Sequence, residues 1–101
     1  MLSRLLRWFR SGGARPPIAS GTGPASVQVL AANPKRTGLI VTNLSNNRIF
    51  LGLGYPAIVG GGIALMSRTT WTMDDSTFTT GAIFAISDST GNTGVAIQEF
   101  E

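Results

Sequence analysis

Short apolar runs separated by turn residues constrain the fold of this chain more than any other feature of its sequence. In the stretch 37–54, an apolar run at 39–41 and an alternating run at 49–53 flank the residues Leu-Ser-Asn-Asn. Asn tolerates unusual backbone angles, so this quartet indicates a turn, and because Asn-Asn is a weaker signal than Asn-Gly, its type stays open. We therefore expect a hairpin. Apolar side chains on both faces of each strand place it at the centre of a covered sheet.

Five further segments have the β pattern, in which apolar residues alternate with polar ones or form a short continuous run. Turn-forming residues separate them, and the stretch 88–94 between the last two is predicted to be a hairpin loop. Together with the two strands of the hairpin this makes about seven strands, which predicts an all-β domain of the β-sandwich or jelly-roll-like type over residues 25–101. The five segments are 25–32, 63–66, 69–73, 82–87 and 95–100.

Composition supports one small β domain that associates with other proteins. The chain has 101 residues, enough for a single domain, of which 43% are hydrophobic, only 13% are charged and 13 are Gly. Its mean hydropathy is positive. We expect more apolar surface than one small core can bury, and therefore self-association or burial in a larger assembly.

Two residue types that serve many active sites are missing from the sequence. The chain has no Cys and no His, which excludes disulfides, most zinc sites, Ser-His and Cys-His nucleophiles, and histidine acid–base catalysis. The remaining candidate acids and bases show no spacing that places a pair in a cleft. We expect no enzyme activity, no cofactor and no metal site; those candidates are Asp74, Asp75, Asp88, Glu99, Glu101, Lys35 and Tyr55.

The positive charge of the chain is concentrated near its N-terminus. Four Arg lie within the first fifteen residues, which contain no acid, whereas the remainder has four basic and five acidic residues. The basic character therefore belongs to an N-terminal arm, over residues 1–24, and not to a nucleic-acid-binding face of the domain. The four are Arg4, Arg7, Arg10 and Arg15.

The first ten residues have the pattern of a short amphipathic helix. Leu2, Leu5, Leu6 and Phe9 follow the i, i+3, i+4, i+7 spacing of one helix face. A helix of this length, about 13 Å, is too short to span a bilayer and forms in water only when docked. We favour docking into a groove of a partner over capping of its own domain or binding to a membrane surface. The predicted partner-binding residues are Leu2, Arg4, Leu5, Leu6, Arg7, Phe9 and Arg10.

A linker is expected between the arm and the domain. Residues 11–24 are rich in Gly, Pro and Ser, and the Pro-Pro pair at 16–17 stiffens an extended segment that cannot pair as a central strand. Fourteen extended residues span roughly 45 Å. The arm can therefore bind well away from the domain.

Three loops contain candidate sites of other kinds. The Gly-rich stretch 55–62 lacks the Lys-Ser/Thr of a phosphate-binding loop; either it presents Tyr55, Ile58 and Val59 to a neighbouring subunit or it packs over a sheet edge. Lys35 and Arg36 are expected to be solvated, and the Asp-Asp-Ser-Thr stretch 74–77 to be a turn without a cation.

Trp71 is the remaining candidate for a residue of the oligomer interface. It belongs to the strand predicted at 69–73, where it shares a face with Met73, and we expect it in the core or a subunit interface.

In its order of landmarks, the sequence resembles the small all-β modules of tailed-bacteriophage virion proteins. The landmarks, over roughly residues 25–101, are Ala-Ala-Asn-Pro-Lys-Arg, LIVTN, RIFLGLG, a Gly-rich loop, GGGIAL, a short strand with Trp, TGAIFAIS and VAIQEFE. Such modules occur among capsid decoration or cement proteins, head fibres and tail accessory subunits. The resemblance implies a structural subunit that assembles as a symmetric oligomer; it supplies no catalytic residues.

We therefore expect a non-enzymatic virion component, a homo-oligomer for which a trimer is one arrangement. The arm would bind a capsid, portal or tail protein; Arg contacts with packaged DNA are a less favoured use of it. The alternative is a peripheral binding protein whose basic helix holds an anionic membrane or nucleic acid. Salt distinguishes the two, because electrostatic binding collapses as ionic strength rises and apolar docking does not.

Overall fold

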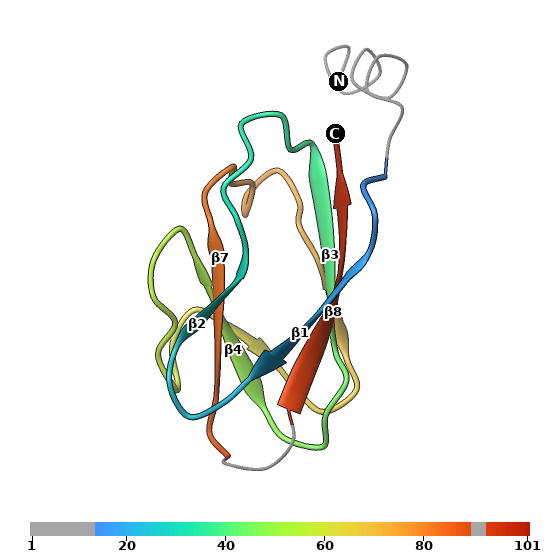
Figure 1. Ribbon diagram of the computed structural model, residues 1–101. Helices are drawn as coiled ribbons and strands as arrows, with labels where there is room; N and C mark the ends of the chain where they lie inside the picture. The colour runs from blue at the N-terminus through green and yellow to red at the C-terminus, as the bar shows by residue number, and fades with distance from the viewer. Residues whose placement is uncertain (1–13, 90–92) are drawn as a thin grey trace.

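The computed structural model describes residues 14–89 and 93–101, which form two antiparallel four-stranded sheets. The all-β prediction is confirmed, with eight strands where about seven were expected. One sheet has the order β1-β8-β3-β6 and the other β2-β7-β4-β5 (Figure 1). The strands are β1 (Ile18–Thr22), β2 (Val27–Leu30), β3 (Gly38–Asn43), β4 (Ile49–Leu53), β5 (Ile63–Leu65), β6 (Thr70–Thr72), β7 (Ile83–Ser87) and β8 (Thr93–Phe100).

A single apolar core lies between the two sheets. In β3 and β8, alternate residues are buried, as the two-residue period of a pleated strand requires. Leu39 and Val41 of one sheet are 1% and 0% exposed, as are Ile49 and Leu51 of the other at 0% each. These side chains belong to one continuous buried cluster, so the two sheets are held together by apolar side chains from both.

The predicted hairpin over 37–54 is wrong. Both of its strands form, but β3 pairs with β6 and β8, and β4 pairs with β5 and β7. The intervening residues carry the chain from one sheet to the other. Because each strand has an apolar face, the two can bury these faces by lying across the core from one another just as well as by pairing.

The hairpin predicted around 88–94 is wrong for the same reason. β7 and β8 form at 83–87 and 93–100, but they belong to different sheets. Alternation predicts strands; it contains no information about which strands pair.

One strand lies within the segment that was predicted to be a linker. β1 pairs with β8 along its whole length, from Ile18 opposite Ile97 to Thr22 opposite Thr93. It begins directly after Pro16 and Pro17 and lies at the edge of its sheet, where the missing N–H of a preceding proline removes no bond of a central strand. The helix predicted over residues 1–10 lies outside the described part of the chain.

A buried asparagine holds the turn between β3 and β4. The Asn43 side chain is fully buried, and its Nδ2 donates to the carbonyl oxygens of Asn47, Leu65 and Met66 at 2.7, 3.0 and 3.0 Å. Its Oδ1 accepts from the backbone N–H and the hydroxyl of Ser45, both at 2.8 Å. One side chain therefore joins the crossover to the turn that follows β5.

We predict that Asn43→Ala destabilises the fold by about 2 kcal/mol or more, because three carbonyl groups lose a donor and the bond to the Leu65 carbonyl is buried, where water cannot replace it. Denaturant titration of the full chain measures this loss. Thr42→Ala is the matched control: it removes an exposed hydroxyl pair with Thr70 and should cost less than about 1 kcal/mol. Equal costs for the two variants would contradict the role assigned to Asn43.

Candidate interaction surfaces

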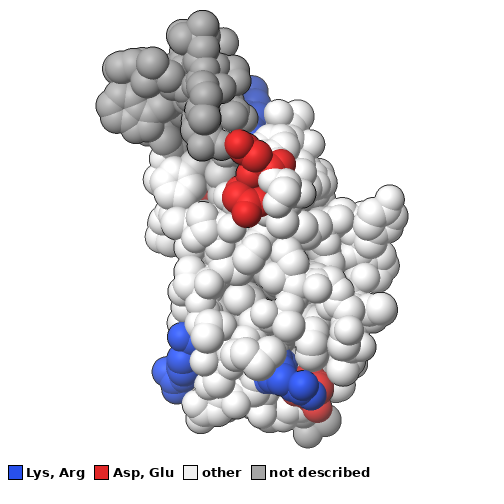
Figure 2. All heavy atoms as spheres, turned by 180° about the vertical axis from the view of Figure 1, so that it is seen from behind, with Lys and Arg blue, Asp and Glu red and all other residues white. Residues whose placement is uncertain are grey.

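Charge is almost absent from the strands of this protein. The eight strands contain one charged residue, Glu99, and its side chain is buried. The outward positions of β3, β6 and β8 hold small, apolar or neutral polar residues. Figure 2 shows the consequence on one face of the molecule, where Lys, Arg, Asp and Glu gather toward the two ends and the middle is free of charge.

Three large apolar side chains project from the loop between β4 and β5. Tyr55, Ile58 and Val59 are 76%, 65% and 51% exposed, and we call this stretch, residues 54–62, the apolar loop. The structure thus places on the surface the three loop residues proposed as an oligomer contact. They lie on a loop without a charged residue.

The backbone of the apolar loop is fixed against the sheet. Ala57 is buried and its N–H donates to Ser26 Oγ at 2.8 Å. Gly52 of β4 lies directly beneath the loop, where an added Cβ would come within 2.3 Å of the Tyr55 carbonyl oxygen. Gly62 has a φ of +69°, and an added Cβ there would come within 2.1 Å of the Leu51 carbonyl oxygen. The exposed side chains are therefore presented from an ordered backbone, which lowers the entropy cost of binding.

Trp71 is placed differently from the loop residues with which it was grouped. It lies on β6, an edge strand of the other sheet, opposite Val41. Its ring is half-buried and packs against the core cluster, on the same face as the buried Met73, as the sequence predicted. Trp71 therefore contributes mainly to the core and is not part of the apolar loop.

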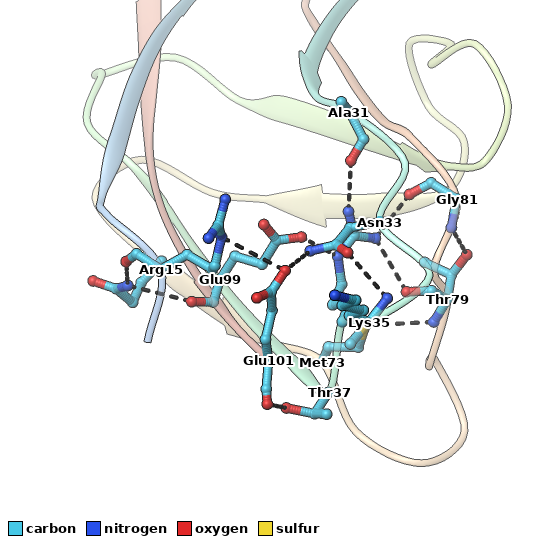
Figure 3. Close-up of polar contacts among 12 residues, drawn as sticks. Arg15, Ala31, Asn33, Lys35, Thr37, Met73, Thr79, Gly81, Glu99 and Glu101 are labelled. Carbon is cyan, nitrogen blue, oxygen red and sulfur yellow. Dashed lines mark hydrogen bonds and ion pairs between the residues drawn. The ribbon is translucent and has the colours of Figure 1, made fainter. Parts of the chain in front are cut away.

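The prediction that Arg36 is solvated is wrong. Its side chain is 2% exposed, and its Nε donates to Glu99 Oε2 at 2.7 Å. Its other two nitrogens donate to backbone carbonyls of Gly81 at 2.7 Å, Thr79 at 3.1 Å and Ala31 at 2.8 Å. These contacts lie at one end of the sheets (Figure 3). Sequence reasoning missed this role because the acid that neutralises Arg36 lies 63 positions away; Lys35 beside it is exposed, as expected.

Hydrogen bonds close to Glu99 also fix the point where the N-terminal segment meets the domain. The Arg15 N–H donates to the Glu99 carbonyl at 2.6 Å, and Gln98 Nε2 donates to the Arg15 carbonyl. Ala14 lies opposite Phe100 in an isolated bridge. Residues 14 and 15 are thus attached to the end of β8, where Figure 3 shows Arg15 beside Glu99. The predicted partner-binding residues Leu2, Arg4, Leu5, Leu6, Arg7, Phe9 and Arg10 lie outside the described residues.

The predicted turn at 74–77 is confirmed. Asp74 Oδ1 accepts hydrogen bonds from the backbone N–H and the hydroxyl of both Ser76 and Thr77, at 2.8–3.0 Å. The side-chain bonds from Ser76 and Thr77 lower the pKa of the Asp74 carboxyl below its usual value. The stabilisation of this turn is therefore present above the pKa of the unfolded chain and is lost as pH falls through the lower pKa of the folded state.

The described residues contain no cluster of three or more His, Cys, Asp or Glu side chains that could hold a metal ion. In the same part of the chain, no helix has the length and hydropathy needed to cross a bilayer. Comparisons of the chain with models of protein families, with curated proteins and with solved structures found no match.

We predict that Arg36→Met lowers the free energy of unfolding by about 3–5 kcal/mol, because it leaves Glu99 as an unpaired buried charge. The variant Lys35→Ala changes an exposed neighbour and should stay within about 0.5 kcal/mol of the wild type. Chemical denaturation followed by tryptophan fluorescence measures both. A cost below about 1 kcal/mol for Arg36→Met would show that the pair does not hold this end of the fold.

Proposed function

We propose that this protein is a non-enzymatic structural subunit of a virion, which assembles with copies of itself and attaches to another virion protein through its N-terminal arm. The observation that carries this proposal is the distribution of charge and apolar surface. Strands without exposed charge and an ordered apolar loop offer the neutral, rigid surface that subunit contacts favour. In this proposal the two packed sheets form a jelly-roll-like body.

The lack of charge at the sheet edges supports self-association in particular. Monomeric β proteins commonly protect their edge strands with Lys, Pro or bulges. The edge strands β1, β5 and β6 contain no charged residue and no Pro, and only β2 has an irregular register. Edges of this kind remain soluble when neighbours cover them, as occurs in a symmetric assembly.

The arm is proposed to anchor the assembly. Its attachment to the domain is fixed at Arg15, whose backbone N–H donates a hydrogen bond to the Glu99 carbonyl at the end of β8. The apolar helix face would enter a groove of a capsid, portal or tail protein; it consists of Leu2, Leu5, Leu6 and Phe9. Arg4, Arg7 and Arg10 would pair with acidic residues at the rim of that groove.

Electron micrographs of particles purified from the source of the gene, with this protein carrying an affinity label, test the virion assignment. We expect label on the particles at regular positions. Label confined to the soluble fraction would contradict the proposal.

We predict that deleting residues 1–10 leaves a folded domain that no longer joins the particle, because the apolar docking face is lost. Thermal melting and co-sedimentation with particles measure folding and incorporation separately. Leu5→Asp should act like the deletion, and Lys35→Ala, with its exposed side chain outside the arm, serves as the control. Incorporation of the truncated protein at full occupancy would refute the anchor.

The salt dependence of attachment distinguishes an arm that binds through apolar contacts from one that binds through electrostatic contacts. We expect attachment to change little between about 50 and 200 mM salt, since phosphate contacts of Arg4, Arg7 and Arg10 would weaken by roughly 40-fold over that range. Retention of the protein on particles washed at both concentrations is the measurement. Release at the higher concentration would favour a peripheral protein that holds an anionic membrane or nucleic acid.

A further inference from the structure

The outer edge of β1 is the most complete open strand edge among the described residues. No described strand pairs with β1 on the side away from β8 (Figure 1). β1 keeps an unbroken register over five residues, whereas the edge strands β5 and β6 have three residues each and β2 has a register shift. A groove of about 410 Å³ lies between β1 and β2, so the second sheet does not cover this edge. β1 is therefore the edge best suited to accept a further strand.

The hydrogen bonds of β8 reveal which side of that strand each backbone group faces. The Gly94 carbonyl oxygen accepts from the N–H of Leu44, directly after β3, at 2.9 Å. On the other side, the Glu99 carbonyl oxygen accepts from the N–H of Arg15 at 2.6 Å. The direction of the N–H and C=O groups alternates along an antiparallel strand. Even-numbered residues of β8 therefore face β3, and odd-numbered residues face β1.

The same alternation sends the backbone groups of Ala19 and Gly21 outward. Ile18 and Ser20 lie opposite odd-numbered residues of β8, so these two bond to β8. Ala19 and Gly21 alternate with them and direct their N–H and C=O groups toward the open edge. β1 contains no charged residue and no Pro, and the residues at these two positions are the smallest. A second strand can therefore approach both sets of backbone groups.

We propose that β1 of one copy pairs antiparallel with β1 of a second copy, which joins their two four-stranded β1-β8-β3-β6 sheets into one continuous sheet. The inference rests on the self-association in the proposed function and names the surface that makes it. Ser20 lies on the two-fold axis, so that Ala19 of each copy is opposite Gly21 of the other. The contact is isologous and closes at a dimer.

The edge is complementary to itself, which is why the occupant is a second copy. In this register each opposite Ala19 and Gly21 form a hydrogen-bonded pair, which exchanges both N–H···O bonds and satisfies all the outward groups. Ser20 meets its own counterpart in the intervening pair, which has no hydrogen bond. Neither β1 nor β2, the strand of the other sheet on this side, contains a charged residue. The strands that approach one another therefore bring no like charges together.

A proline at the outward position of β1 tests the pairing. In the full-length chain, Ala19→Pro removes only the outward N–H, so it blocks the added strand and leaves the bonds to β8. Thr72→Pro is the matched control at the opposite edge of the same sheet. Because the Met73 N–H donates to the Leu39 carbonyl of β3, the N–H of Thr72 beside it also points outward.

Sedimentation velocity over a range of concentrations measures the effect of these variants. The wild type should associate, and Ala19→Pro should weaken its association about 30-fold, because the dimer loses one hydrogen bond from each copy. Thr72→Pro should associate like the wild type.

A single cysteine tests the register, because the chain has no Cys of its own. The two Cα atoms of an antiparallel pair without a hydrogen bond lie about 4.5 Å apart, within the range of about 4.4–6.8 Å that a disulfide spans. Under mild oxidation, Ser20→Cys should become a covalent dimer at concentrations where the wild type associates. Thr72→Cys, on the other edge, should remain unlinked on a non-reducing gel.

A second blocking variant covers the case in which Ala19→Pro does not fold. Ala19 is exposed, and Ala19→Lys adds a charge there that meets its counterpart across the two-fold axis, so it should also weaken association. Circular dichroism and thermal melting verify that each variant is folded.

The possible outcomes separate the inference from the proposed function. Wild-type association of the folded Ala19 variants, or equal weakening by Thr72→Pro, would overturn the pairing of β1 and leave self-association standing. A Ser20→Cys protein that stays unlinked while Ala19→Pro dissociates would assign the edge to a different strand and also overturn the inference. A wild type that is monomeric at every concentration would overturn both the inference and the proposed self-association.

Discussion

The buried pair of Arg36 and Glu99 is the interaction on which one whole end of the structure depends. It joins β8 to the loop before β3 and, through the carbonyls of Thr79 and Gly81, to the loop before β7. A buried ion pair adds little net stability compared with apolar packing, but each partner makes the other indispensable. Its effect is to fix geometry: the segment at Arg15, the C-terminal end of β8 and the loops before β3 and β7 are held in one arrangement.

Once these charges are confined to the end of the domain, the rest of the sheet surface is left neutral. The strands expose Thr, Ala, Gln and Ile in place of the Lys and Glu that keep many β proteins apart. The apolar loop adds three exposed apolar side chains to this surface. This distribution is costly for a solitary domain and suited to a subunit, which is why we propose that the chain functions in an assembly.

The sequence predicted the strands of this fold better than their partners. Continuous apolar runs identified β3 and β7, and alternation identified β4 and β8. Both predicted hairpins were wrong, because a strand can bury its apolar face equally well beside a neighbour in its sheet or across the core from one. β1 was not predicted from the sequence, because the Pro and Gly residues around it are typical of a linker. The sequence left open whether Ile58 is exposed or packs over a sheet edge, and the structure shows it exposed. The burial of Arg36 could not be predicted, since its partner Glu99 is distant in sequence and only the tertiary fold brings them together.

A cryo-electron microscopy reconstruction of the full-length protein in its assembled state tests the central claim most directly, which is that copies join through neutral surfaces. We predict contacts between subunits made by the sheet surfaces and the apolar loop, with the charged ends of each domain facing away from them. An assembly held instead by ion pairs between these charged ends, with Tyr55 and Ile58 still exposed to solvent, would contradict the account.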